Sequence, residues 1–194
     1  MKSSNNFSIS TDEELMVLLN KGEVAAFDEL YARYGNRLMV YFTRMLNFDT
    51  ILAQDALQDL FMKIVEAPER FDSNRSFKTW IFSIASNYCK NVYRHRNVVL
   101  QAHEEIENER TVNENAFFHL ANKMDSSLFK NLLNETLNSL PLEKKEAFIL
   151  KYQEDKSIAE IALIQNCPEG SVKSRLHYTI KMLETRLKIF DPQN

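Results

Sequence analysis

The sequence predicts an all-α protein of two small helical domains joined by an acidic, partly helical linker, with a helix-turn-helix in the C-terminal domain. The chain of 194 residues contains only three Gly and four Pro, too few for a turn-rich β protein. Its apolar residues recur three and four positions apart, the period of an α-helix. Acidic residues dominate 104–125, whereas cations dominate 70–96 and the C-terminal helix-turn-helix. We therefore expect domains at 10–97 and 128–190 and a linker at 98–127.

Three core-forming helices are expected at the start of the first domain. Ser10-Thr11-Asp12-Glu13 has the pattern of a capping box, and a turn around Gly22 should end the first helix. Gly35-Asn36 is then expected to bend the chain between the second and third helices. The apolar side chains expected in the second and third helices are Phe27, Leu30, Tyr31, Tyr34, Leu38, Tyr41, Phe42 and Met45.

Residues 53–66 predict a helix with one apolar stripe and one face of acids and amides. That polar face carries Gln54, Asp55, Gln58, Asp59 and Glu66. Such a face is usually solvated. The alternative is a docking face for a basic helical partner, whose Arg side chains would meet the carboxylates in bidentate pairs. The residues of this helix alone leave both interpretations open.

A loop at 71–77 and a long helix from about 77 to 96 are predicted next, after Pro68. The helix has a polar stripe of Ser83, Ser86, Asn87, Lys90, Asn91 and Arg94, with Phe82, Tyr93 and Arg96 beside it. Cations, amides and aromatic rings on one surface suit the phosphates and bases of unpaired strands. For Phe77 and Trp80 the core is the more common position, because aromatics at helical spacing mostly pack.

The linker has weak periodicity, with a short helical pattern at 116–120. Apolar spacing from Leu128 to Tyr152, interrupted by Pro141, then predicts helices that support the helix-turn-helix.

The helix-turn-helix is predicted at 157–188. Ser157 and Glu160 have the spacing of a capping box, Asn166 stands where the turn needs a left-handed residue, and Pro168 suits the first turn of the second helix. The outer surface of that helix bears short hydroxyls and long cations, which can reach phosphates and base edges. These residues are Ser171, Lys173, Ser174, Arg175, His177, Tyr178 and Lys181. A helical hairpin with a solvated basic face has the same pattern, so the motif favours DNA binding without establishing it.

Several classes of protein are disfavoured. Cys89 and Cys167 lie far apart with no ligand pattern around them, which indicates free thiols in a reducing cytoplasm. No apolar run reaches transmembrane length and no signal peptide is evident, so we expect a cytoplasmic protein. The four His show no ligand spacing, and no phosphate loop or nucleophile arrangement occurs; we expect no enzyme, metal or cofactor. The net charge of −3 fits a protein whose DNA affinity is completed by a larger basic partner.

Two sets of motifs, one in each predicted domain, resemble those of a known family and follow the same order along the chain. Residues 54–61 and 77–87 resemble region two of the extracytoplasmic-function sigma factors of RNA polymerase. The segments that resemble region four are 137–141, 148–152, 158–162 and 170–176. The resemblance covers about Asp12 to Leu187 apart from the linker, and two motif sets in the right order are more specific than either alone.

The resemblance implies an initiation factor that joins bacterial core RNA polymerase and directs it to promoter DNA. An anti-sigma factor is implied as a further partner, and no direct membrane insertion is expected. The residues that would dock on the coiled-coil clamp of the largest polymerase subunit are Gln54, Asp55, Gln58 and Asp59. The loop at 71–77 would capture a flipped base of the minus-ten element. The minus-ten contacts would be Phe71, Asn74, Arg75, Phe77, Asn87, Lys90 and Arg94.

The minus-thirty-five element would lie against the second helix of the helix-turn-helix. By the resemblance, Lys173, Ser174, His177 and Tyr178 reach bases or nearby phosphates, and Ser171, Arg175 and Lys181 hold the backbone. Many members carry Arg where this chain has Tyr178 and Gly where it has Asn166, so the promoter preference of relatives does not transfer.

The alternative is a stand-alone helix-turn-helix regulator that binds duplex DNA as a dimer, with the N-terminal block as a sensor or dimerisation domain. The segment Phe71 to Arg96 discriminates between the two, because a sensor domain needs no surface for single strands.

Overall fold

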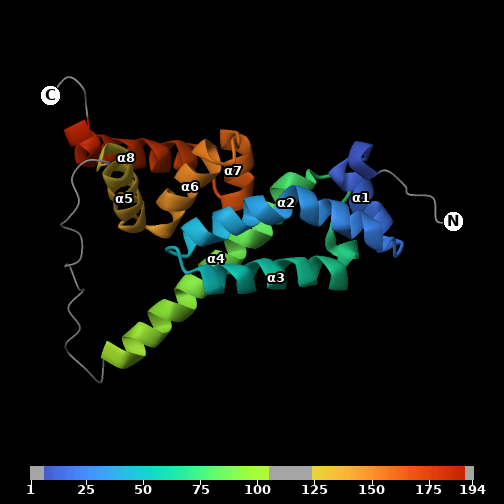
Figure 1. Cartoon of the computed structure of the whole chain (residues 1–194). Helices are drawn as coiled ribbons and strands as arrows, with labels where there is room; N and C mark the ends of the chain where they lie inside the picture. Colours follow the sequence, from blue (N-terminus) through green and yellow to red (C-terminus); the bar gives the residue numbers. More distant parts are fainter. Residues whose placement is uncertain (1–6, 105–123, 191–194) are drawn as a thin grey trace.

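The computed structural model describes residues 7–104 and 124–190, and within these ranges every regular element is a helix, which confirms the predicted fold class. The helices are α1 (Asp12–Asn20), α2 (Val24–Met45), α3 (Thr50–Glu66), α4 (Phe77–Glu104), α5 (Met124–Asn138), α6 (Leu142–Tyr152), α7 (Ile158–Gln165) and α8 (Glu169–Leu187), and three short 3-10 turns are η1 (Phe7–Ile9), η2 (Pro68–Arg70) and η3 (Lys188–Phe190) (Figure 1). Helix α4 continues past its expected end near residue 96, and α5 begins before residue 128. The helical pattern expected at 116–120 lies outside the described residues.

The capping box of α1 lies one residue later than predicted. Thr11, not Ser10, is the N-cap: its hydroxyl accepts the backbone N–H of Glu14 at 3.2 Å, and the Glu14 carboxylate accepts the Thr11 N–H at 2.9 Å. Glu13 makes a different contact, because its carboxylate accepts the backbone N–H of Phe77 at 2.8 Å. The first turn of α1 is thereby joined to the first residue of α4.

Helix α2 is continuous, so the bend expected at Gly35-Asn36 is wrong. Gly35 is buried within the helix, and the ring of Tyr31 lies 3.4 Å from the position that a Cβ atom would occupy. A glycine costs a helix interior only about 1 kcal/mol relative to alanine. Helix α2 packs along its length against α1 and α3, and its side chains Leu30, Leu38 and Phe42 are fully buried. This packing outweighs the cost of one glycine.

The helix-turn-helix has the predicted caps. The Ser157 hydroxyl accepts the Glu160 N–H at 3.2 Å, and the Glu160 carboxylate accepts the Ser157 N–H at 2.8 Å. Asn166 adopts the left-handed conformation, with φ of 51°. Pro168 is the N-cap of α8, directly before its first helical residue. The local signals of this motif are therefore confirmed.

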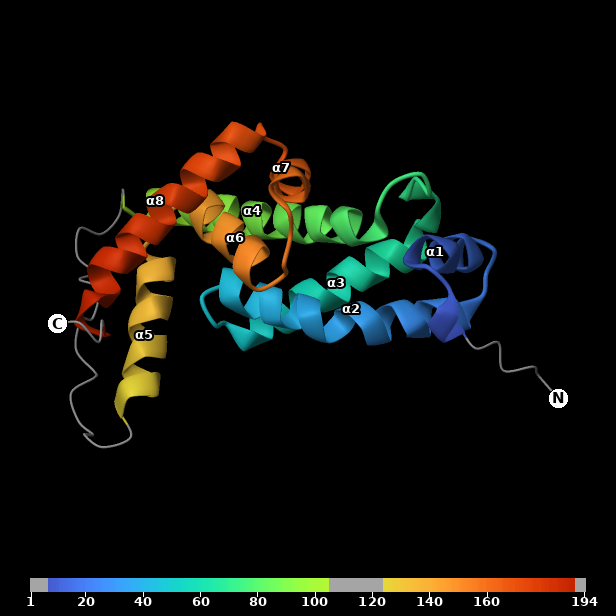
Figure 2. The same cartoon turned by 90° about the horizontal axis from the view of Figure 1, so that it is seen from above.

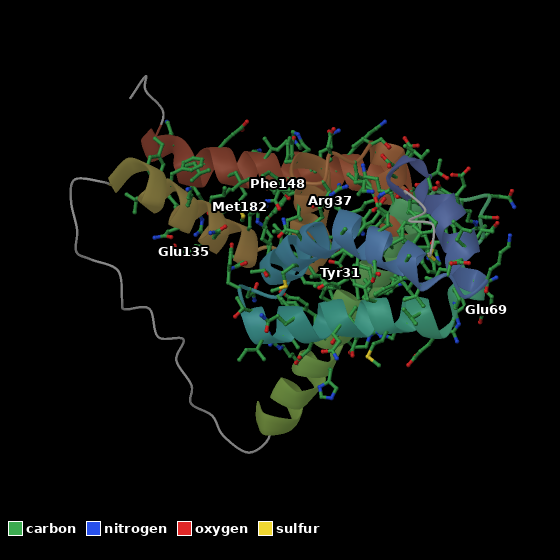
Figure 3. The ribbon with its side chains drawn as sticks, turned by 45° about the vertical axis from the view of Figure 1, so that its right-hand side comes forward. Tyr31, Arg37, Glu69, Glu135, Phe148 and Met182 are labelled. Carbon is green, nitrogen blue, oxygen red and sulfur yellow. The ribbon has the colours of Figure 1, made fainter. Side chains whose placement is uncertain are left out.

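The two halves of the chain pack against each other, with α7 on α4 and α6 on α2 (Figures 1 and 2). One apolar cluster runs through both halves, and polar pairs join them as well. The Tyr41 hydroxyl donates to the Glu146 carboxylate at 2.7 Å, and Arg37 forms a salt bridge of 2.7 Å with Glu154. Figure 3 shows Arg37 on the side of α2 that faces α6 and α7. The sequence did not predict this arrangement.

Candidate nucleic-acid and polymerase interfaces

The polar face of α3 is exposed to solvent. Gln54, Asp55, Gln58 and Asp59 are all exposed, while Ala53, Ala56, Leu60 and Ile64 bury the opposite side of the helix. Among the described residues, neither Asp55 nor Asp59 has a salt-bridge partner. Asp59 accepts a hydrogen bond of 3.3 Å from the Tyr88 hydroxyl, and partial burial together with this carboxylate raises the pKa of Tyr88. The face therefore retains two uncompensated carboxylates one helical turn apart.

An apolar groove of about 570 Å³ borders this face, between α2 and α3. Phe27 and Tyr31 line it from α2, and Leu57, Phe61 and Met62 line it from α3. We expected Tyr31 in the core, but the side chain is 48% exposed. Helical spacing cannot separate a buried aromatic from one that lines a groove, because both lie on the same stripe. Val65 of α3 is 49% exposed and also lines the groove.

The loop at 71–77 rests on a cluster of aromatic rings. Phe71 packs edge to face with Phe77, with ring centroids 5.5 Å apart, and both contact Trp80. Phe77 is completely buried and Phe71 is nearly so. The exposed loop residues include Asn74 and Arg75, which were the other expected contacts. The rings of Phe71 and Phe77 thus support the loop from below, and Asn74 and Arg75 lie on its surface.

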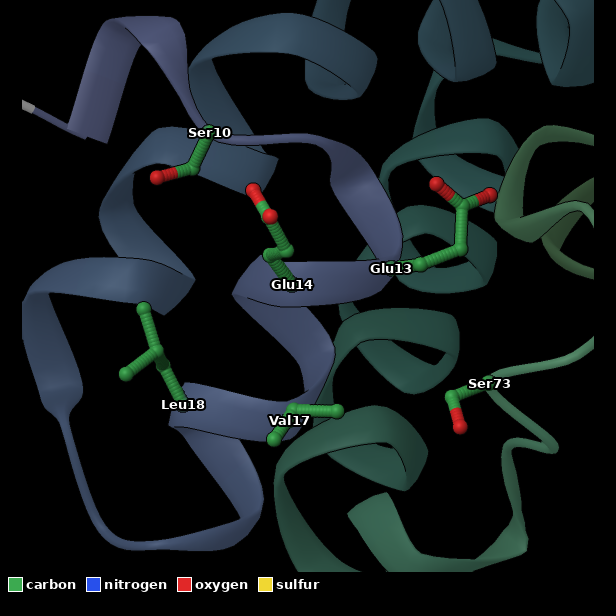
Figure 4. A pocket seen from close by; sticks show the side chains of 6 residues that line it. All are labelled: Ser10, Glu13, Glu14, Val17, Leu18 and Ser73. Carbon is green, nitrogen blue, oxygen red and sulfur yellow. The ribbon is translucent and has the colours of Figure 1, made fainter.

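Asp72 organises the tip of this loop. Its carboxylate accepts the backbone N–H of Asn74 at 3.0 Å and the Asn74 side-chain amide at 3.1 Å, and these hydrogen bonds lower the pKa of Asp72. Arg75 lies 3.4 Å from the same carboxylate in an exposed ion pair. A depression of about 540 Å³ separates the loop from α1 (Figure 4). Glu13, which holds the first residue of α4, lines this depression together with Ser73 of the loop.

Helix α4 presents only part of its expected polar stripe. Asn87 and Arg94 are exposed, but Lys90 is half-buried beside α7, where its ammonium group lies 3.5 Å from the carbonyl oxygen of Gln165. Ser86 is buried, and its hydroxyl has no hydrogen-bond partner within the described part of the chain.

Two aromatic side chains expected on this surface lie elsewhere. Phe82 is completely buried and packs edge to face on Tyr41, with centroids 5.4 Å apart. Tyr93 is half-buried, and its hydroxyl donates to the Met45 carbonyl at 2.7 Å. The prediction that these rings lie on an open surface is wrong for Phe82, because the packing of α2 on α4 was not foreseeable from the spacing within α4.

Helix α8 displays the expected cationic surface. Lys173, Ser174, His177, Tyr178 and Lys181 are exposed, whereas Ser171 and Arg175 are half-buried. The Arg175 guanidinium donates to the Gln165 side-chain oxygen at 2.6 Å and lies 3.1 Å from the Cys167 sulfur. Arg175 therefore fixes the turn between α7 and α8. Lys144 of α6, which the motif did not indicate, places its ammonium group 3.2 Å from the centroid of the Tyr178 ring.

Two kinds of feature are absent from the described residues. Within 7–104 and 124–190, no helix has the length and apolarity required to cross a membrane. In the same residues, no three His, Cys, Asp or Glu side chains are grouped as ligands for a metal ion.

Comparisons with known proteins agree with both motif sets. Residues 30–98 match the family Sigma-70 region 2, and residues 130–183 match the family Sigma-70, region 4. The ECF RNA polymerase sigma-E factor of Haemophilus influenzae is 31% identical over 184 residues, which cover 92% of this chain and 96% of that protein. The sigma-E factor of Escherichia coli K12 is 28% identical over 183 residues, covering 92% and 95%.

Two solved structures have a similar fold. CnrH, in complex with the cytosolic domain of CnrY, superposes with a TM-score of 0.68 at 23% identity and covers 92% of this chain and 97% of that one. The sigma factor RpoE of Bartonella quintana, in complex with the anti-sigma factor NepR, gives a TM-score of 0.65 at 23% identity and covers 84% and 97%. The two family matches and a relative that is 31% identical over 96% of its length lead to one conclusion: this chain belongs to the ECF family of RNA polymerase sigma factors.

Proposed function

We propose that this chain directs core RNA polymerase to specific promoters and starts transcription there, acting in the cytoplasm and leaving catalysis to the polymerase. The observation that carries the proposal is that one chain joins an acidic, amide-rich helical face to two separate cationic surfaces. A stand-alone regulator would need only the cationic surface of α8. The domain limits at 10–97 and 128–190 are part of this proposal.

The face of α3 would bind the polymerase. Asp55 and Asp59 have no salt-bridge partner among the described residues, so a basic helix of the partner would supply one. The adjoining groove between α2 and α3 would receive an apolar side chain, because stable interfaces combine an apolar centre with a polar rim. Gln54 and Gln58 would belong to that rim.

The loop at 71–77 and α4 would hold the opened strand of the minus-ten element. Extracting a base from its stack costs a few kcal/mol, and contacts to the extracted base must recover it. Asn74 and Arg75 are exposed on a loop held by the Phe71 and Phe77 rings, as such contacts require. Asn87, Lys90 and Arg94 would bind the strand along α4.

Helix α8 would lie in the major groove of the minus-thirty-five element. Lys173, Ser174, His177 and Tyr178 would reach bases or nearby phosphates, and Lys181 would contact the backbone. Ser171 and Arg175, which are half-buried, would contribute at the edge of the surface.

The two halves of the chain would separate when it engages a promoter. The names of the two DNA elements imply centres about 25 base pairs apart, which is roughly 85 Å of duplex at 3.4 Å per pair. Helix α4, with 28 residues at 1.5 Å each, is only about 42 Å long. Helix α8, with 19 residues, adds about 28 Å at most beyond its contact with α4 through α7. The closed chain is therefore too short to reach both elements, and the contact of α7 with α4 also engages Lys90.

An anti-sigma factor would be a further partner. Solved relatives of the same fold are the CnrH complex with CnrY and the RpoE complex with NepR. In this chain such an inhibitor would cover the surfaces that the polymerase and the promoter require.

The docking proposal is tested by charge reversal on α3. The double variant Asp55→Arg, Asp59→Arg should lose core polymerase in a pull-down while keeping its circular dichroism, because both side chains are exposed and make no salt bridge to any other described residue. The double variant Glu23→Arg, Glu184→Arg has the same change of charge at exposed sites elsewhere and should still bind. Equal binding of both variants would remove α3 from the interface.

The wild-type chain in the same assay separates the two functional classes. Failure to bind core polymerase, together with dimeric binding of duplex DNA by the chain alone, would support a stand-alone regulator instead.

A further inference from the structure

Lys144 and Tyr178 form a contact between two helices at the middle of the cationic surface of α8. The Lys144 ammonium group lies 3.2 Å from the centroid of the Tyr178 ring. Tyr178 is 44% exposed, and its neighbours Lys173, Ser174, His177 and Lys181 are exposed on the same helix. The helix-turn-helix motif comprises only α7 and α8, so Lys144, on α6, adds a cation from outside it.

The backbone beside this pair is fixed. Thr179, directly after Tyr178, is completely buried, and its hydroxyl lies 3.4 Å from the Lys144 carbonyl oxygen and 2.9 Å from the Arg175 carbonyl oxygen. Helices α6 and α8 pack extensively at this point. Both the main chain and the side chain of Lys144 are thus held next to the ring of Tyr178.

The charge of Lys144 is available for a ligand. Within the described residues, no carboxylate lies within salt-bridge distance of its ammonium group. The face of a tyrosine ring attracts a cation by about 0.5–1 kcal/mol at an exposed site, but it accepts no strong hydrogen bond. An ammonium group has three N–H donors. Most of the donors of Lys144 can therefore be used by an anion that approaches the surface of α8.

We propose that Lys144 binds a DNA phosphate beside the minus-thirty-five element and that the Tyr178 ring positions its ammonium group. The inference rests on the proposed function, which places α8 in the major groove. A lysine held over the ring loses less side-chain freedom when it meets a phosphate than a lysine in solution does. The minus-thirty-five surface is then built from two helices, with α8 in the groove and α6 at its edge.

The test measures promoter binding by the holoenzyme as a function of salt. The probe is a promoter fragment recovered by mapping the DNA that the wild-type chain occupies after induced expression. The variant Lys144→Met keeps the alkyl packing and removes the charge. It should weaken binding roughly fivefold to tenfold at 0.15 M salt and reduce the slope of log K against log salt by about 1, the expected loss for one phosphate contact.

Matched variants separate this role from a general loss of positive charge. Lys130→Met removes an exposed lysine of α5 and should leave the slope unchanged. Lys144→Arg should retain wild-type binding. The proposal would be overturned if Lys144→Met and Lys130→Met changed the slope of log K against log salt equally. Failure of the wild-type holoenzyme to bind the fragment would instead overturn the proposed function.

The positioning role of Tyr178 has its own readout. Tyr178→Phe keeps the ring and should preserve the salt slope. In a Tyr178→Ala background, Lys144→Met should cost clearly less than it does in the wild-type chain, because the two side chains act as a unit. Strict additivity of the two substitutions would show that the ring does not position Lys144.

Discussion

Glu13 stabilises a helix that begins 64 residues further along the chain. The first four N–H groups of a helix have no partner within it, and Glu13 accepts the one at Phe77. A carboxylate at this position is also favoured by the helix dipole. Phe77 directly follows the exposed residues of the loop, so Glu13 fixes the end of the segment proposed to hold the opened DNA strand.

We therefore predict that Glu13→Ala impairs promoter opening. Loss of a capping interaction should lower the free energy of unfolding by about 1 kcal/mol, measured in urea. Opening, followed by the fluorescence of 2-aminopurine in the minus-ten element of a polymerase complex, should decrease at least severalfold. Binding of a minus-thirty-five duplex should not change.

The control for this prediction is Glu14→Ala. It removes the capping box of α1 at comparable cost but leaves the contact to Phe77 intact. Equal opening by the two variants would show that Glu13 contributes only stability.

The local sequence could not assign these two acids. Ser10, Thr11, Glu13 and Glu14 form two overlapping capping-box patterns, one residue apart. The structure uses the second, because the first would draw Glu13 away from α4. Ser157 and Glu160 face no such competition, and there the prediction is confirmed.

At the scale of an element, α2 shows how tertiary packing overrides a local signal. Gly35 suggested a bend, yet the helix runs unbroken from Val24 to Met45. The sequence gives no measure of how firmly α1 and α3 hold each half of α2, since these contacts are long-range. The groove between α2 and α3 and the pairing of Lys144 with Tyr178 were not predictable for the same reason.

Gly35→Ala is accordingly predicted to stabilise the protein. Alanine gains roughly 0.5–1 kcal/mol over glycine in a helix interior. Its Cβ would meet the ring of Tyr31 at 3.4 Å, an ordinary contact with a side chain that is 48% exposed and able to shift. The midpoint of urea unfolding should rise.

The variant Gly22→Ala, in contrast, is expected to destabilise the protein. Gly22 has φ of 90°, which an L-residue with a Cβ rarely adopts, so this substitution should lower the midpoint of urea unfolding. The strain is in the backbone, because apart from the two adjacent residues no described residue has an atom within 4 Å of the new Cβ. If Gly35→Ala instead lowered the midpoint of urea unfolding, the Tyr31 ring would be unable to move away from the new Cβ at position 35.

At the scale of the whole molecule, the contact between the two halves contains polar groups that are costly to bury. Lys145 and Lys156 are almost completely buried there. Lys145 donates to the Asn47 side chain at 2.7 Å, and Lys156 lies 4.6 Å from the centroid of the Phe82 ring. Such groups regain hydration when the halves separate, which makes the contact suited to opening.

The two lysines make this contact sensitive to pH. Burial lowers the pKa of Lys145 to about 8, and burial together with the like charge of Lys78 lowers the pKa of Lys156 to about 8. Separation of the halves would return both toward the ordinary value of 10.5. The closed form thus binds fewer protons between pH 8 and 10.5, so raising the pH through this window stabilises the closed form.

We predict that the radius of gyration of the free chain, measured by small-angle X-ray scattering, decreases from pH 7 to pH 9.5. Burial and Glu146 raise the pKa of Tyr41 and of Cys89 in the closed form. Cys89 opposes the lysines only near and above its ordinary pKa of 9.0, so the two lysines outweigh it in this interval. The double variant Lys145→Met, Lys156→Met removes both titrating lysines and should not become more compact between pH 7 and pH 9.5. A wild-type radius that stays constant, or a variant that retains the full response, would show that other groups govern the closure of the two halves.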